Sequence, residues 1–425
     1  MTHHTSKFFP LKALRVGPLR PRYRDVMIPL DEARAFVLGK CEPGPTTTVA
    51  IGEAADLVTA SDLAAAGPIP PFDNTAMDGF AIRAADLADA PVTLDMVGTI
   101  AAGAAPDIEV GPGQAVRIMT GAPMPPGADA VVMVELTNMA DDEKSVDVKE
   151  AVPAGNHIRP AGDDVQTGQV VFPAGTHLGA AHLGVCASIG VYDIPVFSRP
   201  RIGVISTGDE LLDGPGPLGI GQIHDSNRHT LLALVNGMGA TGVDLGLVPD
   251  DEDQIRGAMS TAAESCDAVI TSGGVSMGDF DYVKKVLTEI GDMAWMQVAI
   301  KPAKPLAFGT VGGTPIFGLP GNPVSSMVSF ELFARPGIRK MMGHAEPIPA
   351  PVRGIAAADM LRGPDGKTHF ARVHATSTDD GRYAASFSGG QGSHQLSAMA
   401  AANALAVVPN GEGIKAGDPV DLLLL

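Results

Sequence analysis

Residues 267–291 read DAVITSGGVSMGDFDYVKKVLTEIG, and this stretch decides the fold class of the protein. The apolar run DAVIT predicts a buried strand, and the periodicity of DFDYVKKVLTEIG predicts a helix. A loop rich in glycine and small residues lies between them, and two acidic residues stand at the start of the helical segment. A buried strand followed by such a loop and a helix is the repeating unit of a parallel sheet that carries helices on both faces.

The same unit recurs on both sides of this stretch. Further strands are predicted at 201–207, 243–248, 294–300 and 315–319, and further helices at 226–239, 251–266 and 323–334. This alternation predicts an α/β multidomain protein whose central domain is a doubly wound parallel sheet. Ligands of such sheets bind at the carboxyl ends of the strands, so the loops that follow the strands are the first place to look for a site.

Outside this region the pattern of apolar and turn-forming residues changes. Residues 28–38, IPLDEARAFVL, predict an amphipathic helix. Short apolar runs that alternate with Gly and Pro turns predict a β-rich unit from residue 69 to about 153. Residues 154–195 are Gly-rich with short strands, and a small β domain follows residue 345. Residues 1–24 hold several Lys and Arg and no acidic residue, which predicts a disordered leader.

Composition excludes several classes of protein. The 425 residues carry a formal net charge of −18, which argues against a nucleic-acid-binding protein. No stretch approaches ~20 uninterrupted apolar residues, so no membrane span is expected. The three cysteines, Cys41, Cys186 and Cys266, are far apart and suit neither a disulfide framework nor a zinc cluster. Free thiols indicate a reducing, cytoplasmic location.

The loop after DAVIT can be interpreted in two ways. Residues 274–278, GVSMG, match the G-x-S-x-G pattern in which Ser276 would be the nucleophile of a hydrolase. In such an elbow the strand runs directly into the first glycine and the helix begins right after the serine, whereas here the predicted strand ends three residues before Gly274. The pair Gly273–Gly274 with Ser276 instead resembles a nest of backbone N–H groups that binds an anion.

Two acidic residues follow the predicted nest. Asp279 and Asp281 precede the helix, and carboxylate oxygens beside a phosphate are ligands that suit Mg²⁺. Asp281 could instead cap the helix, a role that requires no metal.

Two further loops follow strands and carry groups that attract anions. In IKPAKPL (300–306), Lys301 and Lys304 each precede a proline, Pro302 or Pro305, which holds the preceding residue extended so that the ammonium groups can be aimed at an oxyanion. In GLPGNPVSS (318–326), Asn322 is a predicted N-cap, and Ser325 and Ser326 lie at the positive end of the following helix. An exposed loop and an ordinary capped helix are the alternatives.

Acidic and amide residues are the last group of candidate site residues. Asp209 and Glu210 follow one predicted strand, and Asp225 and Asn227 could accept hydrogen bonds from a heterocycle, although either pair could also cap a helix. In the β-rich unit, PPFDNTAMDGFA (70–81) carries Asp73, Asn74 and Asp78, for which local Asx turns are the alternative. Together these features predict a site for a phosphorylated, heterocyclic ligand with Mg²⁺ and a second oxyanion near the lysines.

Seven motifs in order resemble one family. PPFDNTAMDGFA, RIMTGAPMP, STGDEL, TSGGVSMGDFDYVKK, IKPAKPLAFG, GLPGNPVSS and GGQGSH look like the MoeA and gephyrin E-domain family of molybdopterin molybdenumtransferases, from about residue 25 to the end. The resemblance implies an elongated homodimer of four-domain chains: a split linker domain I (25–68 and 154–195), a β-rich domain II (69–153), a MogA-like, molybdopterin-binding domain III (196–345) and a small C-terminal β-barrel, domain IV (346–425).

The resemblance also implies a reaction and a set of residue roles. Molybdenum from molybdate would be inserted into adenylylated molybdopterin, and AMP would be released with Mg²⁺ as cofactor. The nest and Ser325 would hold phosphates, Asp279 and Asp281 would hold Mg²⁺, and Glu210 and Asp225 would contact the pterin or nucleotide. Molybdate would bind Lys301, Lys304, Pro302, Pro305, Arg372 and Ser393. Asp73, Thr120 and Asp163 resemble functional positions supplied by the other subunit.

Two other functions fit the same fold. Relatives similar to gephyrin scaffold receptors and cytoskeleton, so a non-catalytic binding protein is the first alternative, and an adenylyltransferase that uses domain III alone is the second. The complete set of acids and lysines favours the enzyme. The resemblance further implies contact with molybdopterin adenylyltransferase and with molybdoenzyme chaperones.

Overall fold

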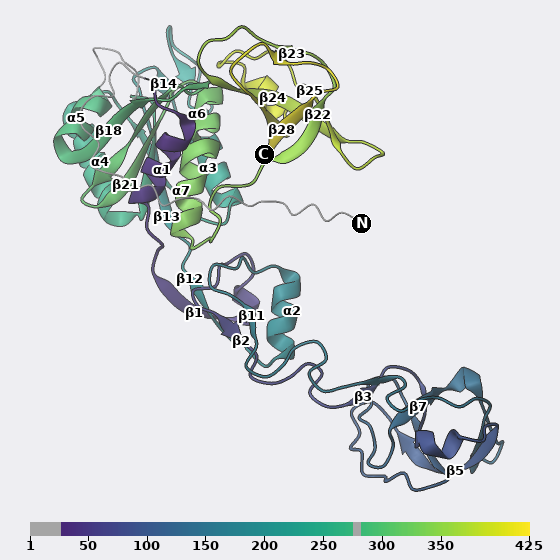
Figure 1. Ribbon diagram of the computed structural model, residues 1–425. Coiled ribbons are helices and arrows are strands. Elements are labelled where there is room, and N and C mark those ends of the chain that lie inside the picture. The colour runs from purple at the N-terminus through teal and green to yellow at the C-terminus, as the bar shows by residue number, and fades with distance from the viewer. Residues whose placement is uncertain (1–26, 275–281) are drawn as a thin grey trace. The chain divides into compact units, whose positions relative to one another are not determined.

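A computed structural model describes residues 27–274 and 282–425 of the chain. The chain divides into two compact units, a smaller one of residues 48–196 and a larger one formed by residues up to 47 and from 197 to the end (Figure 1). Among the described residues, no helix is both long and apolar enough to cross a membrane.

The larger unit is built on a six-stranded sheet, which confirms the predicted α/β class. In spatial order the strands are β16 (Thr241–Val248), β13 (Arg201–Thr207), β17 (Ala268–Ser272), β21 (Thr314–Leu319), β20 (Pro305–Val311) and β18 (Gly291–Gln297). The first four are parallel. β20 runs antiparallel to both of its neighbours, so the expectation of a wholly parallel sheet is wrong at this edge.

A tight turn explains the antiparallel strand. Only Gly312 and Gly313 connect β20 to β21, and both have positive φ values of 58° and 93°. A two-residue connection of this kind reverses the chain and pairs the flanking strands as a hairpin. β20 was not predicted, because the lysine-proline segment before it reads as a loop.

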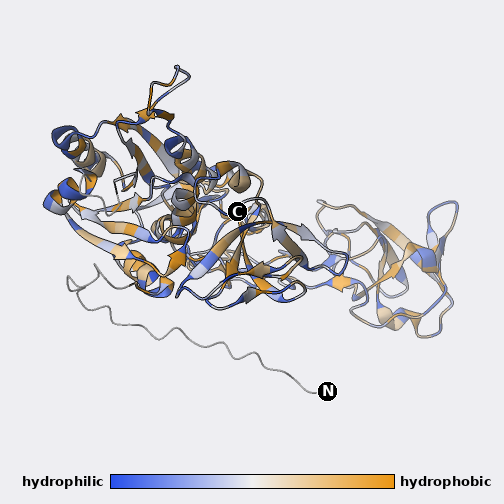
Figure 2. Cartoon of the chain, turned by 90° about the horizontal axis from the view of Figure 1, so that it is seen from above, coloured by the Kyte–Doolittle hydropathy of each residue, from blue (hydrophilic) through white to orange (hydrophobic). Residues whose placement is uncertain are grey.

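Helices cover both faces of the sheet, as predicted. Neighbouring residues of a strand point to opposite faces, so Val204 and Ile270 pack in one core while Ile205 and Val269 pack in the other. The first face is covered by α1 (Leu30–Lys40), α3 (Asn227–Gly237), α6 (Pro323–Ser329) and α7 (Arg335–Met341), and the second by α4 (Glu252–Ser265) and α5 (Tyr282–Ile290). The helix predicted at 323–334 continues from α6 through a π-helical turn, η4 (Phe330–Ala334), into α7. Hydrophobic residues, drawn in orange, lie in both the strands and the helices (Figure 2).

A small barrel follows the sheet domain. Its strands are β22 (Val352–Ala356), β24 (Thr368–Ser377), β25 (Tyr383–Phe387), β26 (Ala404–Val408) and β28 (Pro419–Leu424), and it closes because β24 pairs with both β25 and β26. The short strands β23 (Met360–Leu361) and β27 (Gly413–Ile414) pair with each other, and α8 (Leu396–Ala400) precedes β26. The short strand β19 (Ile300–Lys301) adds to β24 in parallel. This pairing attaches the lysine segment to the barrel.

The smaller unit contains a second six-stranded sheet. Its strands, in spatial order, are β7 (Ala130–Met133), β4 (Gly79–Ile82), β6 (Gln114–Ile118), β5 (Val92–Ile100), β9 (Ser145–Val148) and β8 (Thr137–Met139). The rest of the unit has three strand pairs and one helix: β1 (Thr46–Ala50) with β12 (Asp193–Phe197), β2 (Leu63–Ala64) with β11 (Val170–Phe172), β3 (Asn74–Thr75) with β10 (Ile158–Arg159), and α2 (Ala180–Ser188). The division of the chain into four domains stays a prediction.

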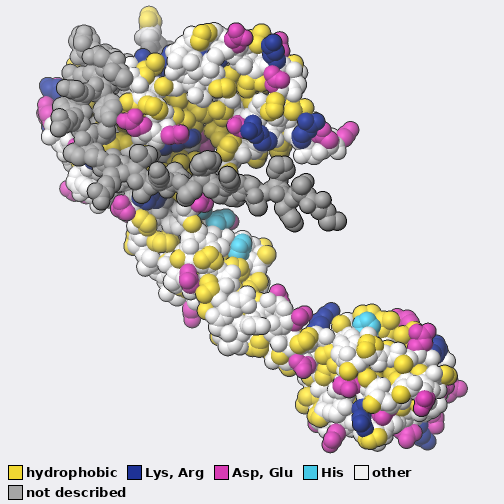
Figure 3. Space-filling model, in the orientation of Figure 1, with side chains coloured by type: hydrophobic (Ala, Val, Ile, Leu, Met, Phe, Trp, Pro, Cys, Tyr) yellow, Lys and Arg dark blue, Asp and Glu magenta, His cyan; other side chains and the backbone are white. Residues whose placement is uncertain are grey.

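Charged side chains of both signs are interspersed on the face of the described residues that Figure 3 shows. Lys and Arg do not merge there into a continuous basic patch.

Gly309 in β20 allows a direct test of the antiparallel edge. A Cβ atom at this position would lie 2.1 Å from the Asp292 carbonyl oxygen of β18. We therefore expect Gly309→Ala to lower the free energy of unfolding by about 3 kcal/mol, measured by urea titration. Gly257→Ala is the control, because its Cβ would meet no atom within 4 Å on the exposed face of α4 and should stabilise by ~0.5–1 kcal/mol. Equal midpoints for Gly309→Ala and the wild type would contradict this packing.

Candidate active site

The backbone at the carboxyl edge of the central sheet forms a tight junction around Gly273. β17 ends at Ser272, one residue later than predicted, and Gly273 and Gly274 follow with φ values of 98° and 65°. The Gly273 N–H donates to the Leu319 carbonyl oxygen at the end of β21. A Cβ on Gly273 would lie 2.9 Å from the Thr207 carbonyl oxygen at the end of β13. Both the left-handed conformation and this close approach require glycine.

The remaining residues of this loop lie outside the described ranges. These are residues 275–281, which include Ser276, Asp279 and Asp281, so the third member of the nest and the two predicted Mg²⁺ ligands stay predictions. The hydrolase alternative depends on Ser276, so it also stays a prediction. Within 27–274 and 282–425, no group of three or more His, Cys, Asp and Glu side chains could hold a metal ion.

The lysine segment lies at the same edge of the sheet. β18 is antiparallel to β20, and β20 is antiparallel to β21, so the carboxyl ends of β18 and β21 point the same way. Lys301 in β19 lies opposite His369 of β24, and the Lys304 carbonyl oxygen accepts a hydrogen bond from Val298 N. Both lysine side chains are exposed and make no hydrogen bond or ion pair with the described residues. They are therefore available to an anion.

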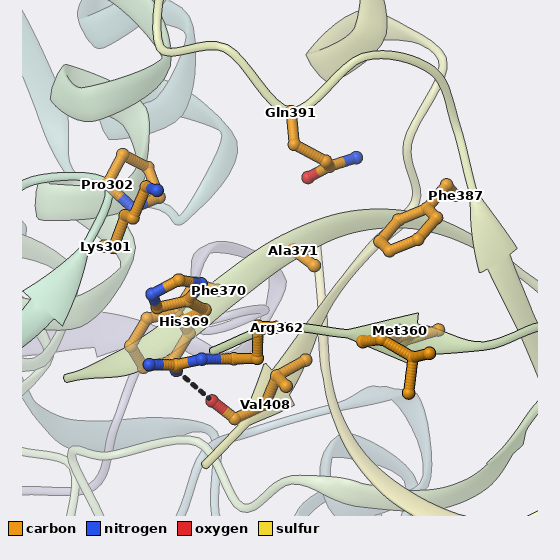
Figure 4. A pocket seen from close by; sticks show the side chains of 11 residues that line it. Lys301, Pro302, Met360, Arg362, His369, Phe370, Ala371, Phe387, Gln391 and Val408 are labelled. Atoms are coloured by element: carbon orange, nitrogen blue, oxygen red, sulfur yellow. Dashed lines mark hydrogen bonds between the residues drawn. The ribbon is translucent and has the colours of Figure 1, made fainter. Parts of the chain in front are cut away.

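Lys301 and Pro302 border a cavity of about 170 Å³ at the mouth of the barrel (Figure 4). Its walls are largely apolar and include Met360, Phe387 and Val408. The side chain of Gln391, which also lines it, is held by hydrogen bonds to the backbone of Arg372. The cavity thus offers apolar surface beside an exposed ammonium group.

A polar network supports one wall of this cavity. His369 Nε2 lies 3.0 Å from Asp365 Oδ2, and Arg362 pairs with Asp365 and donates to the Lys367 carbonyl oxygen. The hydrogen bond from His369 lowers the pKa of Asp365 to about 2. Burial, partly opposed by Asp365, lowers the pKa of His369, so the ring is neutral at pH 7. Arg362, which also lines the cavity, is paired with Asp365, so Lys301 supplies the cavity's charge that is unpaired among the described residues.

Arg372 is the most unusual side chain at the site. It is fully buried, and its Nη2 donates to the carbonyl oxygens of Gly390 and Gly392 at 2.7 and 3.2 Å. Its Nε and Nη1 atoms are also buried and have no hydrogen-bond partner among the described residues. Burial lowers the pKa of this guanidinium. A buried cation with unused donors is costly unless an anion satisfies them.

Arg372 lies beside the start of α6. Ser393 follows Gly392, and its carbonyl oxygen accepts a hydrogen bond from Val324 N, the second residue of α6. Asn322 occupies the predicted N-cap position and Pro323 is the first helical residue, but the Asn322 side chain makes no capping hydrogen bond. The hydroxyl of Ser326 is buried and has no hydrogen-bond partner within 27–274 and 282–425. The structure thus brings together Arg372, Ser393 and Ser325.

Acidic residues gather at the ends of β13 and β16. Asp209 Oδ1 accepts a hydrogen bond from Asp250 N, and the Glu210 carboxylate folds back over Gly208. Burial, together with the charges of Asp209 and Glu210, raises the pKa of Asp250. Glu210 is exposed and can reach a ligand.

Asp225 has a different environment from the one predicted. Its side chain is 1% exposed, with Oδ1 accepting from Ser206 Oγ and Oδ2 accepting from Arg228 Nε. Arg228 also pairs with Asp244 and Asp213. Burial alone would lower the pKa of Arg228, but hydrogen bonds with Asp244 and Asp225 outweigh it and raise the pKa. Asp225 therefore faces protein groups rather than open space.

Three family profiles match the chain in order. They are "MoeA N-terminal region (domain I and II)" over residues 28–190, "Probable molybdopterin binding domain" over 203–340 and "MoeA C-terminal region (domain IV)" over 355–425. A Haemophilus influenzae protein named molybdopterin molybdenumtransferase is 37% identical over 93% of this chain and 98% of its own length. Molybdopterin molybdenumtransferase 2 of Mycobacterium tuberculosis is 40% identical over 88% of this chain and 93% of that protein.

The chain belongs to the MoeA family. It is a transferase of molybdenum cofactor biosynthesis. A solved structure of a molybdopterin biosynthesis MoeA protein from Pyrococcus horikoshii OT3 superposes with a TM-score of 0.82 and 30% identity, covering 94% of this chain and all of that one. The predicted resemblance is confirmed.

The predicted residues of the MoeA N-terminal region lie in exposed turns of the smaller unit. Asp73 Oδ1 accepts from Ala161 N at 2.7 Å, which places it beside the turn that carries Asp163. Asp78 Oδ1 accepts from both N and Oγ1 of Thr120, and these bonds lower the pKa of Asp78. Both acids bond to segments far away in sequence, so the alternative of local Asx turns is wrong for them.

Several residues that shape this MoeA site were missed from sequence. Arg228 and His369 pair with Asp225 and Asp365, which lie only three and four residues before them, so this spacing was a usable signal. The other partners of Arg228, Asp213 and Asp244, are more distant in sequence and gave none. Asp250 lies two residues after a predicted strand end, and that position was a usable signal.

Proposed function

We propose that this chain inserts molybdenum from molybdate into adenylylated molybdopterin and releases AMP in a Mg²⁺-dependent step. The observation that carries the proposal is the buried guanidinium of Arg372, whose Nε and Nη1 donors have no partner among the described residues. A tetrahedral oxyanion such as molybdate offers acceptor oxygens and the missing negative charge. The names of the relatives, molybdopterin molybdenumtransferase, supply the class of substrate.

The oxyanion would be held between the sheet domain and the barrel. Lys301 lies opposite His369 on β24. Arg372 follows three residues later on that strand, about 10 Å along it and on the opposite face, so the two cations would approach the oxyanion from different sides. The residues proposed to bind molybdate are Lys301, Lys304, Pro302, Pro305, Arg372 and Ser393. The lysines and the arginine would offset the repulsion between molybdate and a phosphorylated substrate and hold the two in reacting geometry.

The adenylylated molybdopterin would lie along the carboxyl edge of the sheet. Gly273, Gly274 and Ser276 would hold its phosphates, with Ser325 at the start of α6. Glu210 would contact the pterin or nucleotide, and Asp225 would support that surface through Arg228. Asp73, Thr120 and Asp163 would come from the second subunit of a homodimer.

Asp279 and Asp281 would hold Mg²⁺. Their carboxylate oxygens are the hard donors that this ion prefers. When bound, Mg²⁺ would supply positive charge to the phosphoanhydride that is cleaved when AMP leaves.

Release of AMP tests the proposal. The purified chain is mixed with adenylylated molybdopterin and Mg²⁺, with and without molybdate, and AMP is followed by chromatography. We expect AMP to appear only with molybdate. If adenylylated molybdopterin binds but no AMP is released, even when tungstate replaces molybdate, the chain is a scaffold. If the same amount of AMP is released without molybdate, the reaction is simple hydrolysis.

A further inference from the structure

Asn227, the first residue of α3, joins two loops of the candidate active site. Its Nδ2 donates to Ser272 Oγ at 2.8 Å and to the Gly321 carbonyl oxygen at 2.7 Å. Ser272 directly precedes the Gly273–Gly274 pair, and Gly321 lies in the loop that leads into α6. One side-chain amide therefore connects segments that lie 45 and 94 residues away along the chain.

The chemistry of the partners determines the orientation of this amide. A backbone carbonyl can only accept, so the atom that faces Gly321 O must be the nitrogen of the Asn227 side chain. Both of its N–H groups are then used inside the protein. Ser226, and not Asn227, occupies the N-cap position of α3, so the Asn227 side chain is not needed to cap the helix.

The glycine loop needs support of this kind. Gly273 and Gly274 both have positive φ values, and glycine loses more conformational entropy on ordering than any other residue. The backbone supplies one direct link here, from Gly273 N to Leu319 O at 3.2 Å. The two loops also approach closely, since a Cβ on Gly321 would lie 3.7 Å from Gly273 Cα. A second link between the two loops lowers the entropy cost of ordering them when a ligand binds.

We infer that Asn227 is a positioning residue that orders the glycine loop before the substrate phosphates bind. This inference rests on the proposed function. Asn227 acts through Ser272 and Gly321, and its donors do not touch the substrate. Its removal should therefore weaken substrate binding.

Asn227→Asp is the first test, because it keeps the size of the side chain and replaces the donor nitrogen with an oxygen that repels Gly321 O. We expect the dissociation constant for adenylylated molybdopterin, measured by calorimetry, to rise about 10- to 100-fold, as for the loss of two hydrogen bonds. Asn236→Asp is the matched control: it lies in the same helix, and its Oδ1 accepts from Gly242 N, a bond that aspartate can also make. This control should bind within about 2-fold of the wild type.

A double-mutant cycle separates positioning from direct contact. Ser272→Ala removes only the acceptor, and also serves as a second probe if Asn227→Asp does not fold. If Asn227 acts through Ser272, the double variant should bind at most about 3-fold more weakly than Asn227→Asp alone. Fully additive losses, or an Asn227→Asp variant that binds like the wild type, would overturn the inference. Failure of the wild type to bind adenylylated molybdopterin would instead count against the proposed function.

Discussion

The Asp279→Asn variant is expected to release AMP at least about 100-fold more slowly than the wild-type chain, while its folding is unchanged. The substitution removes a negative charge and a hard oxygen ligand, but it keeps the size of the side chain. Without that carboxylate the phosphoanhydride would lose the preorganised charge proposed to stabilise its cleavage. Single-turnover release of AMP, followed by chromatography at saturating molybdate, measures the effect.

Asp279→Glu is the control for this prediction. It retains the carboxylate, so it should keep most of the activity and should lose less than about 10-fold. Both variants should unfold at the same urea concentration as the wild type. Unchanged turnover in Asp279→Asn would remove Asp279 from the mechanism, and an equal loss in both variants would show that position, not charge, is what matters there.

Arg372→Met is expected to raise the KM for molybdate by at least about 100-fold without lowering the stability of the ligand-free protein. The two unused donors of the buried guanidinium are the groups proposed to bind the oxyanion, and charge-assisted hydrogen bonds of this kind contribute about 1.5–3 kcal/mol each. Removing a buried, incompletely paired cation and filling its volume with an apolar side chain is often neutral or stabilising. Molybdate-dependent AMP release and urea unfolding measure the two effects.

Arg382→Met is the matched control in the same barrel. Arg382 is exposed and pairs with Asp380, so its loss should change neither the KM for molybdate nor the urea concentration at which the protein unfolds. A large loss of stability in Arg372→Met would show that the guanidinium holds Gly390 and Gly392 in place for structural reasons. An unchanged KM would exclude Arg372 from oxyanion binding.

Much of the architecture could be predicted from local patterns. The apolar runs and helical periods between residues 201 and 334 placed the parallel strands and their helices, because a two-sided sheet requires strands that are apolar throughout. β20 escaped prediction because its proline-bounded start looks like a loop. The Gly312–Gly313 turn that makes it a hairpin strand is a short-range feature, so that turn could have been predicted from the sequence. The π-helical turn between α6 and α7 had no signal in the sequence at all.

The candidate site divides in the same way. The sequence by itself determined which loops are candidates for the site, since glycine pairs, lysine-proline pairs and acids at strand ends depend on residue type and local order. Only the tertiary structure decided what those residues face. Asp225 is enclosed by Ser206 and Arg228, Arg372 is buried with donors that no described residue uses, and Asn227 connects two loops. The physical reason is that burial and hydrogen-bond partners depend on residues brought together from distant parts of the chain, whereas propensity and periodicity depend on neighbours in sequence.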